Sequence, residues 1–257
     1  MLLTFPRECF KSQPGRRFIY CFSVTHDTFQ LFLFDRSGAI RSTALNIHDE
    51  AAMFVRLVRF LVNPDLVPLG FDPSIFWEQG KRYIEILSGT GIVKYEVEGV
   101  LYQNPVMFDR GTTCWSARQA GARKELVVIK DGWRDGDLAG EVEFLNTAKD
   151  KKIPGVGRLL LRDDSFATSP LTIILLRQRQ GLSVTGFKNR VFTRIVLEHY
   201  GPPIRHFTSG LHLLQILRDA IHGGCPFPPH PTFADGSLSR ALSSCQSRRA
   251  SSQHQPR

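Results

Sequence analysis

Short runs of aromatic and β-branched residues, separated by turn residues, recur along the chain and most constrain its fold. Three of them lie near the N-terminus, at Arg17–Val24, Thr28–Asp35 and Ala39–Leu45, with His-Asp and Ser-Gly turn signals between them. This pattern predicts a β-meander. Apolar residues at helical spacing between Asp49 and Leu61 then predict a helix that could cover the meander. We therefore expect a small α+β unit over roughly residues 15 to 75.

A second β-rich segment begins near Lys81. Its strand candidates are 83–87, 91–97, 106–108, 113–117, 126–130, 158–161, 171–176 and 193–197. Helical character appears at 138–147, between the strand candidates, and an amphipathic helix is expected at 211–221. The order predicts an α+β fold with a mostly antiparallel sheet and one inserted helix.

The net charge of +9 favours anionic partners, a class that includes nucleotides, nucleic acids and acidic proteins. Five widely spaced cysteines without a C-x-x-C pair argue against a disulfide framework and a structural zinc site. The N-terminus lacks a signal-peptide pattern, and no apolar stretch approaches the roughly 20 residues that span a bilayer. We therefore expect an intracellular protein, cytoplasmic or nuclear, with no membrane partner. Neither an H-E-x-x-H metal motif nor a G-x-S-x-G nucleophile motif occurs.

The composition changes at Gly223-Gly224. From Cys225 onward Pro, Ser, Arg and Gln dominate and no periodic apolar pattern continues. This composition predicts a disordered tail over residues 225–257.

The residues that carry chemistry lie between 108 and 141. Gly111 marks a turn between two strand candidates, and Lys130 ends the next strand candidate. A glycine turn lets the backbone approach phosphates, and a lysine on the following strand can reach the same phosphates. Glu141 then falls on the predicted helix, where its carboxylate could pair with Lys130. Taken singly, Lys130 also fits an ordinary strand end, and Glu141 and Glu143 fit solvated surface acids.

The segment 194–201 resembles the strand and hinge against which adenine lies in kinases. Backbone groups of Glu198, His199 and Tyr200 would pair with the base edge. The alternative is an edge strand that ends in a Gly-Pro-Pro turn.

Together, these blocks resemble the fungal-type protein kinase domain family over roughly residues 15 to 224. The resemblance rests on Arg17–Asp35, Leu69–Pro73, Arg110–Trp115, Val128–Trp133, Gly140-Glu141, Gly155–Arg158 and Val196–Pro202. It implies an accessory α+β region over 1–100, followed by an incomplete protein-kinase-like fold over 101–224 that includes the N-lobe, the hinge and the first C-lobe helix. The family phosphorylates Ser or Thr with ATP and magnesium. The resemblance assigns Gly111 and Thr112 to the phosphate-covering loop, Lys130 to the phosphate-pairing position and Glu141 to its helix partner.

The sequence departs from the kinase pattern in two respects. It contains neither an H-R-D catalytic loop nor a D-F-G magnesium site, so we assign no catalytic residue and no metal ligand. Asp109 and Cys114 also occupy the first and third glycine positions of a G-x-G-x-x-G loop, and a carboxylate at 109 would repel phosphates. We expect weak ATP binding and a catalytically incomplete chain, either from a truncated or misread gene end or as a genuine short form.

Three functions remain open. The first is a kinase-family chain that acts on a protein substrate when complete. The second is a non-enzymatic, pseudokinase-like module that binds a protein partner. The third, nucleic-acid binding, is disfavoured because the basic residues are spread along the chain without a recognised nucleic-acid motif.

Overall fold

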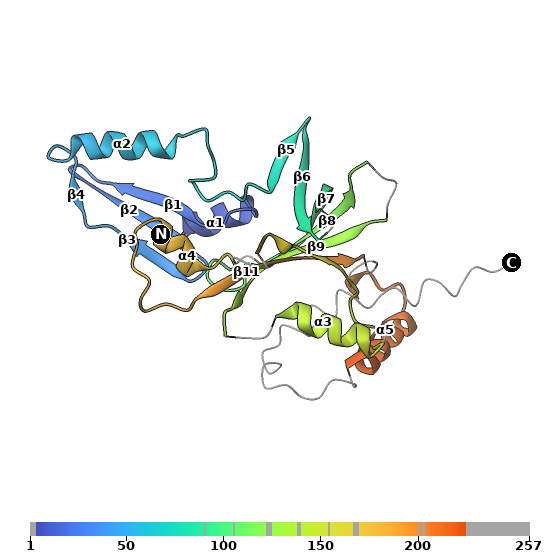
Figure 1. Cartoon of the computed structure of the whole chain (residues 1–257). Coiled ribbons are helices and arrows are strands. Elements are labelled where there is room, and N and C mark those ends of the chain that lie inside the picture. Colours follow the sequence, from blue (N-terminus) through green and yellow to red (C-terminus); the bar gives the residue numbers. More distant parts are fainter. Residues whose placement is uncertain are drawn as a thin grey trace.

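The computed structural model describes residues 4–89, 91–104, 106–121, 125–137, 140–153, 155–166, 170–199, 201 and 204–224. These residues form two antiparallel sheets with helices around them, which confirms the predicted α+β class (Figure 1). The predicted tail over 225–257 lies outside the described residues. No helix in the described part of the chain has the length and apolar character needed to cross a membrane.

The smaller sheet is the predicted β-meander. It consists of β1 (Ile19–Val24), β2 (Thr28–Asp35), β3 (Gly38–Arg41) and β4 (Leu45–Asn46), and β2 pairs with the other three strands. Helix α2 (Ala51–Leu61) lies over this sheet (Figure 1). The ring of Phe54 packs 5.3 Å from that of Phe29, and the ring of Phe60 packs 5.4 Å from that of Tyr20. These aromatic contacts confirm the predicted covering helix.

The larger sheet has the strand order β10-β11-β9-β8-β7-β6-β5. Its strands are β5 (Ile75–Glu78), β6 (Lys81–Ser88), β7 (Gly91–Gln103), β8 (Thr113–Gln119), β9 (Val127–Asp135), β10 (Leu159–Arg162) and β11 (Arg190–Glu198). Helix α3 (Glu141–Asp150) is inserted after β9, as predicted, and packs through Leu145 against Ile195 and Leu197 of β11. The other face carries a core around the fully buried Trp115 and Ile129.

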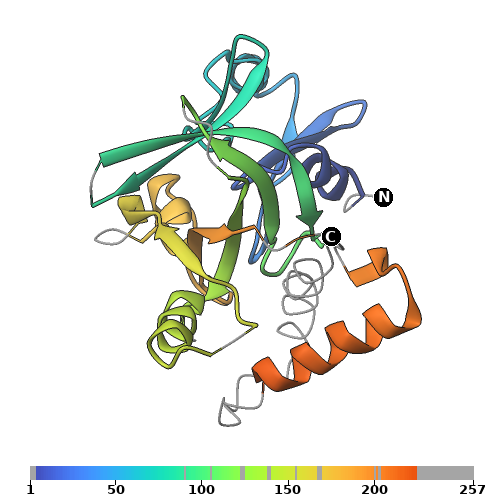
Figure 2. The same cartoon turned by 90° about the vertical axis from the view of Figure 1, so that its right-hand side faces the viewer.

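Helix α5 (Gly210–Gly224) confirms the predicted C-terminal helix. Figure 2 shows it (orange) at the periphery of the molecule. Leu211 and Leu214 on this helix are exposed, whereas Ile216 is buried. The short 3-10 helices η1 (Asp164–Phe166) and η2 (Ile204–His206) complete the described elements.

The strand predicted at 171–176 is wrong, because this segment begins helix α4 (Ile173–Arg179). The Thr172 hydroxyl caps the helix by accepting a hydrogen bond from the backbone N–H of Leu175 at 3.0 Å. Ile173 and Leu176 then fall on one helical face, in the core that also contains Phe18. The strand predicted at 106–108 is also wrong: these residues lie in the loop between β7 and β8.

Helix α1 (Thr4–Ser12) and strand β5 were not predicted from the sequence. Strand β7 runs through residue 100 and pairs with β6 on one side and β8 on the other. Strands β5 and β6 are therefore in the same sheet as β8 to β11, and a functional division of the chain at residue 100 stays a prediction.

Two buried arginine–aspartate pairs join the small sheet and its flanking segments to the larger one. Arg177 of α4 donates from Nε and Nη2 to the two carboxylate oxygens of Asp35 on β2, at 2.7 and 3.0 Å. Arg194 of β11 reaches Asp72, in the segment before β5, at 3.1 Å. These pairs join the two parts together with an apolar core in which Phe18 and Leu33 pack with Trp133 and Phe192.

Candidate functional site

Lys130 lies in the middle of the larger sheet. It stands on β9, opposite Cys114 of β8 and Ile195 of β11. Because successive strand residues alternate between faces, Lys130 shares its face with Val128, which packs in the core under α3. The lysine therefore points to the side of the sheet that carries the helix.

The structure brings Glu141 to this lysine. The ammonium Nζ of Lys130 lies 2.7 Å from both carboxylate oxygens of Glu141. Glu141 is the first residue of α3, directly after Gly140, whose extended backbone begins the helix. A carboxylate in the first turn is favoured by the helix dipole, and the packing of Leu145 on β11 fixes the helix position. The ion pair is partly open to solvent, with side-chain exposures of 19% for Lys130 and 44% for Glu141.

A cavity of about 320 Å³ adjoins this ion pair. Its volume is within the usual range of small-molecule sites. Thr112 lines it, together with the basic residues Arg110, Lys130, Arg134, Arg162 and Arg194 and the acidic residues Glu141, Glu143 and Asp163. Residues from both faces of β11 contribute to its wall, so the cavity wraps around the edge of that strand. The surplus of basic side chains suits a phosphate-bearing ligand.

Gly111 is placed differently from its predicted partners. It adopts a φ of +50°, and a Cβ atom there would lie 2.5 Å from the guanidinium carbon of Arg36. Gly111 is therefore packed against the small sheet and does not line the large cavity. The loop is anchored at its other end too, because Met107 is buried in a core with Phe10 and Phe34.

Asp109, at the first glycine position of the motif, has a φ of +145°, a backbone conformation that favours glycine. Its carboxylate lies 3.4 Å from the Nη2 atom of Arg190. The negative charge that was expected to repel phosphates is therefore partly compensated by an arginine.

The predicted hinge residues lie at and beyond the C-terminal end of β11, and Glu198 is three residues past the position opposite Lys130. Glu198 pairs with Val127, about 10 Å along the strand from the position opposite Lys130. Glu198 and His199 do not line the large cavity, and Tyr200 lies outside the described residues. Contact of these three residues with a base stays a prediction.

Sequence reasoning missed a buried charge network beside Lys130. Arg194 is fully buried and donates to Asp131 from Nε at 2.6 Å and from Nη2 at 2.9 Å. It also reaches Ser74 at 2.5 Å and Asp72 at 3.1 Å. The indole N–H of Trp115 donates to Asp131 at 3.1 Å. A single arginine in a predicted strand, such as Arg194, gives no sign of these partners, because they lie far away in the sequence.

The charges in this network support one another. Burial opposes the charge of Arg194, but the carboxylates of Asp131 and Asp72 outweigh burial and raise its pKa. Burial likewise tends to raise the pKa of Asp72, yet Arg194, Arg17 and hydrogen bonds from Ser74 reverse this and lower it. Arg194 and Asp72 therefore remain charged around neutral pH. The bonds from Arg194 to Asp131 hold β11 against β9, the strand that carries Lys130.

Among the described residues, no group of three or more His, Cys, Asp or Glu side chains could hold a metal ion. We therefore assign no magnesium ligand and no chemical step through magnesium. For a nucleotide, the lining of the large cavity fits the phosphates, since Lys130 and Arg110 are cationic and face it.

Comparison with known families gives one match. The family described as fungal protein kinase matches residues 1–185 and 162–224. No curated protein and no solved structure matches the chain. The matched residues include both sheets, the Lys130–Glu141 pair and helix α5. The chain belongs to the fungal protein kinase family.

Proposed function

We propose that this chain is the nucleotide-binding part of a protein kinase and binds ATP through its phosphates at Lys130. The observation that carries the proposal is the two-oxygen contact of Lys130 with Glu141 beside a basic cavity of about 320 Å³. In protein kinases, a lysine on a strand pairs with a glutamate of the following helix and with the nucleotide phosphates. Family membership supports the same assignment.

Each predicted residue has a role in this proposal. Lys130 holds the phosphates, and Glu141 orients the ammonium group by accepting from it. The backbone at Thr112, which lines the cavity, closes the phosphate end of the site, and Gly111 holds this loop against Arg36. Glu198, His199 and Tyr200 contact the adenine edge. ATP, when bound with magnesium, supplies the phosphoryl group that the family transfers to a protein hydroxyl.

We do not propose that these residues alone carry out phosphoryl transfer. The sequence contains no H-R-D and no D-F-G segment, which supply the catalytic aspartate and a magnesium ligand in protein kinases. Phosphoryl transfer depends on positioning and on neutralising charge, so nucleotide binding without these groups leaves transfer slow or absent.

A pseudokinase-like interaction module is the second candidate. The observation that favours it is the exposed apolar face of α5, formed by Leu211, Leu214 and Leu217. Apolar side chains gathered on one exposed face mark sites where another protein surface packs. In this function, a protein partner covers α5 and the nucleotide site is a structural remnant.

The test is thermal unfolding of the full chain with increasing ATP and magnesium. A ligand at ten times its dissociation constant stabilises the folded state by about 1.4 kcal/mol, so the melting temperature should rise. Lys130→Met should abolish the rise and Glu141→Gln should weaken it. Lys81→Met is the matched control, because Lys81 forms a similar 2.7 Å pair with Glu96 on the same sheet and does not line the cavity.

Two results would contradict nucleotide binding at Lys130, and two further results would distinguish the candidates. An unchanged melting temperature of the wild-type chain up to about 10 mM ATP contradicts nucleotide binding. An ATP-dependent rise that survives Lys130→Met contradicts the assigned site. Transfer of labelled γ-phosphate to protein favours the kinase, whereas binding of a protein partner that Leu214→Lys abolishes favours the interaction module.

A further inference from the structure

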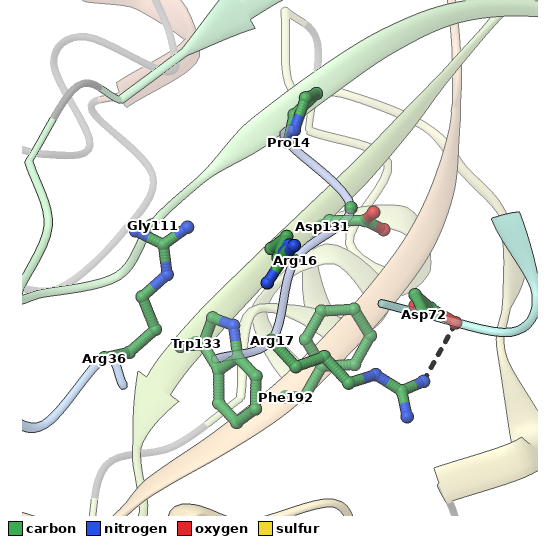
Figure 3. Close-up of a pocket in the computed structure, with 10 residues that line it drawn as sticks. Pro14, Arg16, Arg17, Arg36, Asp72, Gly111, Asp131, Trp133 and Phe192 are labelled. Atoms are coloured by element: carbon green, nitrogen blue, oxygen red, sulfur yellow. Dashed lines mark hydrogen bonds and ion pairs between the residues drawn. The ribbon is translucent and has the colours of Figure 1, made fainter. Parts of the chain in front are cut away.

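A second, much smaller cavity lies between the N-terminal segment and the larger sheet. Its volume is about 10 Å³, and the arginines Arg16, Arg17 and Arg36 line it. Figure 3 shows these arginines ranged across the pocket, with Arg36 beside Gly111 at one end and the Arg17–Asp72 ion pair at the other. The remaining lining residues are Pro14, Gly15, Asp72, Gly111, Asp131, Trp133 and Phe192.

The cavity differs from the one beside Lys130. Asp131 lines the small cavity, whereas its neighbours Lys130 and Gly132 line the large one. Successive residues of a strand face opposite sides of the sheet, so Asp131 faces away from Lys130 and Gly132, and the two cavities share only the side chains of Trp133 and Phe192.

Three buried donors at this cavity have no partner in the described part of the chain. They are the Nε–H groups of Arg16, Arg17 and Arg36. Buried donors in proteins are nearly always satisfied by protein, water or a bound ion. Three such donors on residues that line one cavity therefore indicate an occupant that accepts hydrogen bonds.

Arg36 shows what kind of occupant is needed. Arg36 is only 3% exposed. Its Nη1 atom donates to the carbonyls of Val106 and Met107, each at 3.2 Å. The guanidinium also lies 4.1 Å from the centre of the Phe10 ring. Within the described residues, no carboxylate forms an ion pair with it. Burial lowers the pKa of Arg36 to about 10, so the group still carries its charge at neutral pH.

The nearby carboxylates are already engaged. Asp72 pairs with Arg17 at 2.9 Å and with Arg194 at 3.1 Å, and Asp131 accepts both of its short bonds from Arg194. The arginines around the cavity therefore outnumber the carboxylates, and a buried cation without a counterion is strongly disfavoured. A water molecule would satisfy the donors but not the charge.

We propose that this cavity binds one monatomic anion of chloride size. The volume admits a single water-sized particle and excludes phosphate or sulfate. The anion accepts a hydrogen bond from the unpartnered Nε–H of Arg36 and neutralises the surplus positive charge. It also fixes Arg36, and Arg36 holds the loop between β7 and β8 through Val106, Met107 and the close approach to Gly111.

The experiment compares thermal unfolding of the full chain in sodium chloride and in sodium gluconate at equal ionic strength, without nucleotide. Gluconate is too large for the cavity, so chloride should raise the melting temperature in a saturable manner and gluconate should not. Arg36→Met, which keeps the length of the side chain and removes its charge and donors, should lose the difference. Arg56→Met is the control, because Arg56 is exposed on α2, and it should keep the difference.

A second measurement uses the wild-type chain alone, in case Arg36→Met does not fold. Bromide replaces chloride, and crystals grown with bromide should show an anomalous scattering peak among Arg16, Arg17 and Arg36. Equal melting temperatures in the two salts, or water without an anomalous signal at this position, would overturn the proposal. No nucleotide is present in either measurement, so the outcome does not depend on the proposed kinase function.

Discussion

Replacement of Arg194 by methionine should be among the most destabilising single changes in this chain. The arginine is fully buried, and its removal leaves Asp131 buried without a cation and Asp72 with Arg17 as its only cation. The carboxylate of Asp163 lies 4.0 Å from Nη1 of the arginine that is removed. Removing one partner of a buried ion pair costs about 3–5 kcal/mol. A domain has a total stability of about 5–15 kcal/mol, so the loss is a large share of it. Arg194→Met should therefore fold only marginally.

The assay is equilibrium unfolding in urea followed by tryptophan fluorescence. Trp115 reports directly on the network, since its indole N–H donates to Asp131. The double variant Arg194→Met with Asp131→Asn removes one of the uncompensated charges and should recover part of the lost free energy, with a coupling of about 0.5–3 kcal/mol. A loss below about 1 kcal/mol in Arg194→Met would refute the reasoning, because the network would then behave like a surface ion pair.

The pH dependence of the free energy of unfolding provides a second, independent test of this network. In the wild-type chain the pKa of Asp72 is lowered despite burial, so its contribution to stability is present above the ordinary pKa of about 3.9 and is lost as the pH falls below it. In Arg194→Met, burial is no longer opposed by that arginine, and the pKa of Asp72 should rise. Lowering the pH from 7 to 5 should then increase the stability of the variant and leave the contribution of Asp72 in the wild type unchanged. A variant that loses stability over this range would contradict the argument.

Further changes test the site and the joint between the sheets. Lys130→Met should change the free energy of unfolding in urea by less than about 1 kcal/mol, because its pair with Glu141 is partly exposed. Gly111→Ala should cost about 1–3 kcal/mol in the same assay, since its φ is +50° and the new Cβ atom would meet Arg36. Arg177→Met should cost about 3–5 kcal/mol by urea unfolding, because it leaves Asp35 buried without a cation.

The strands could be predicted because their signal is local. Short apolar runs between turn residues identified β1 to β3 and β6 to β11, and the helical spacing of apolar residues identified α2. The segment at 171–176 was mistaken for a strand because a short apolar run fits a buried strand and a buried helix equally well. The cap at Thr172 decides for the helix, and a single threonine is too common to be recognised as a cap in advance.

The candidate site could be predicted only in part. Lys130 and Glu141 are close in sequence and belong to adjacent elements, so the kinase pattern in the sequence is enough to pair them. The contacts of Arg194 cross 63 residues to Asp131 and 122 residues to Asp72, and no local pattern connects such positions. The packing of the Gly111 loop on the small sheet was missed for the same reason, because the sequence around Arg36 does not indicate that this residue contacts Gly111.

The pair between Asp35 and Arg177 has a consequence for biosynthesis. The two residues are separated by 142 positions, so at about 5–20 residues per second the ribosome needs roughly 7–28 s to deliver the arginine after the aspartate. Strands β1 and β2 have by then long left the exit tunnel, and their hairpin can form from neighbouring residues alone. The hairpin can therefore form many seconds before the cation that pairs with Asp35 is available, and this ion pair cannot join the meander to α4 until Arg177 has been made.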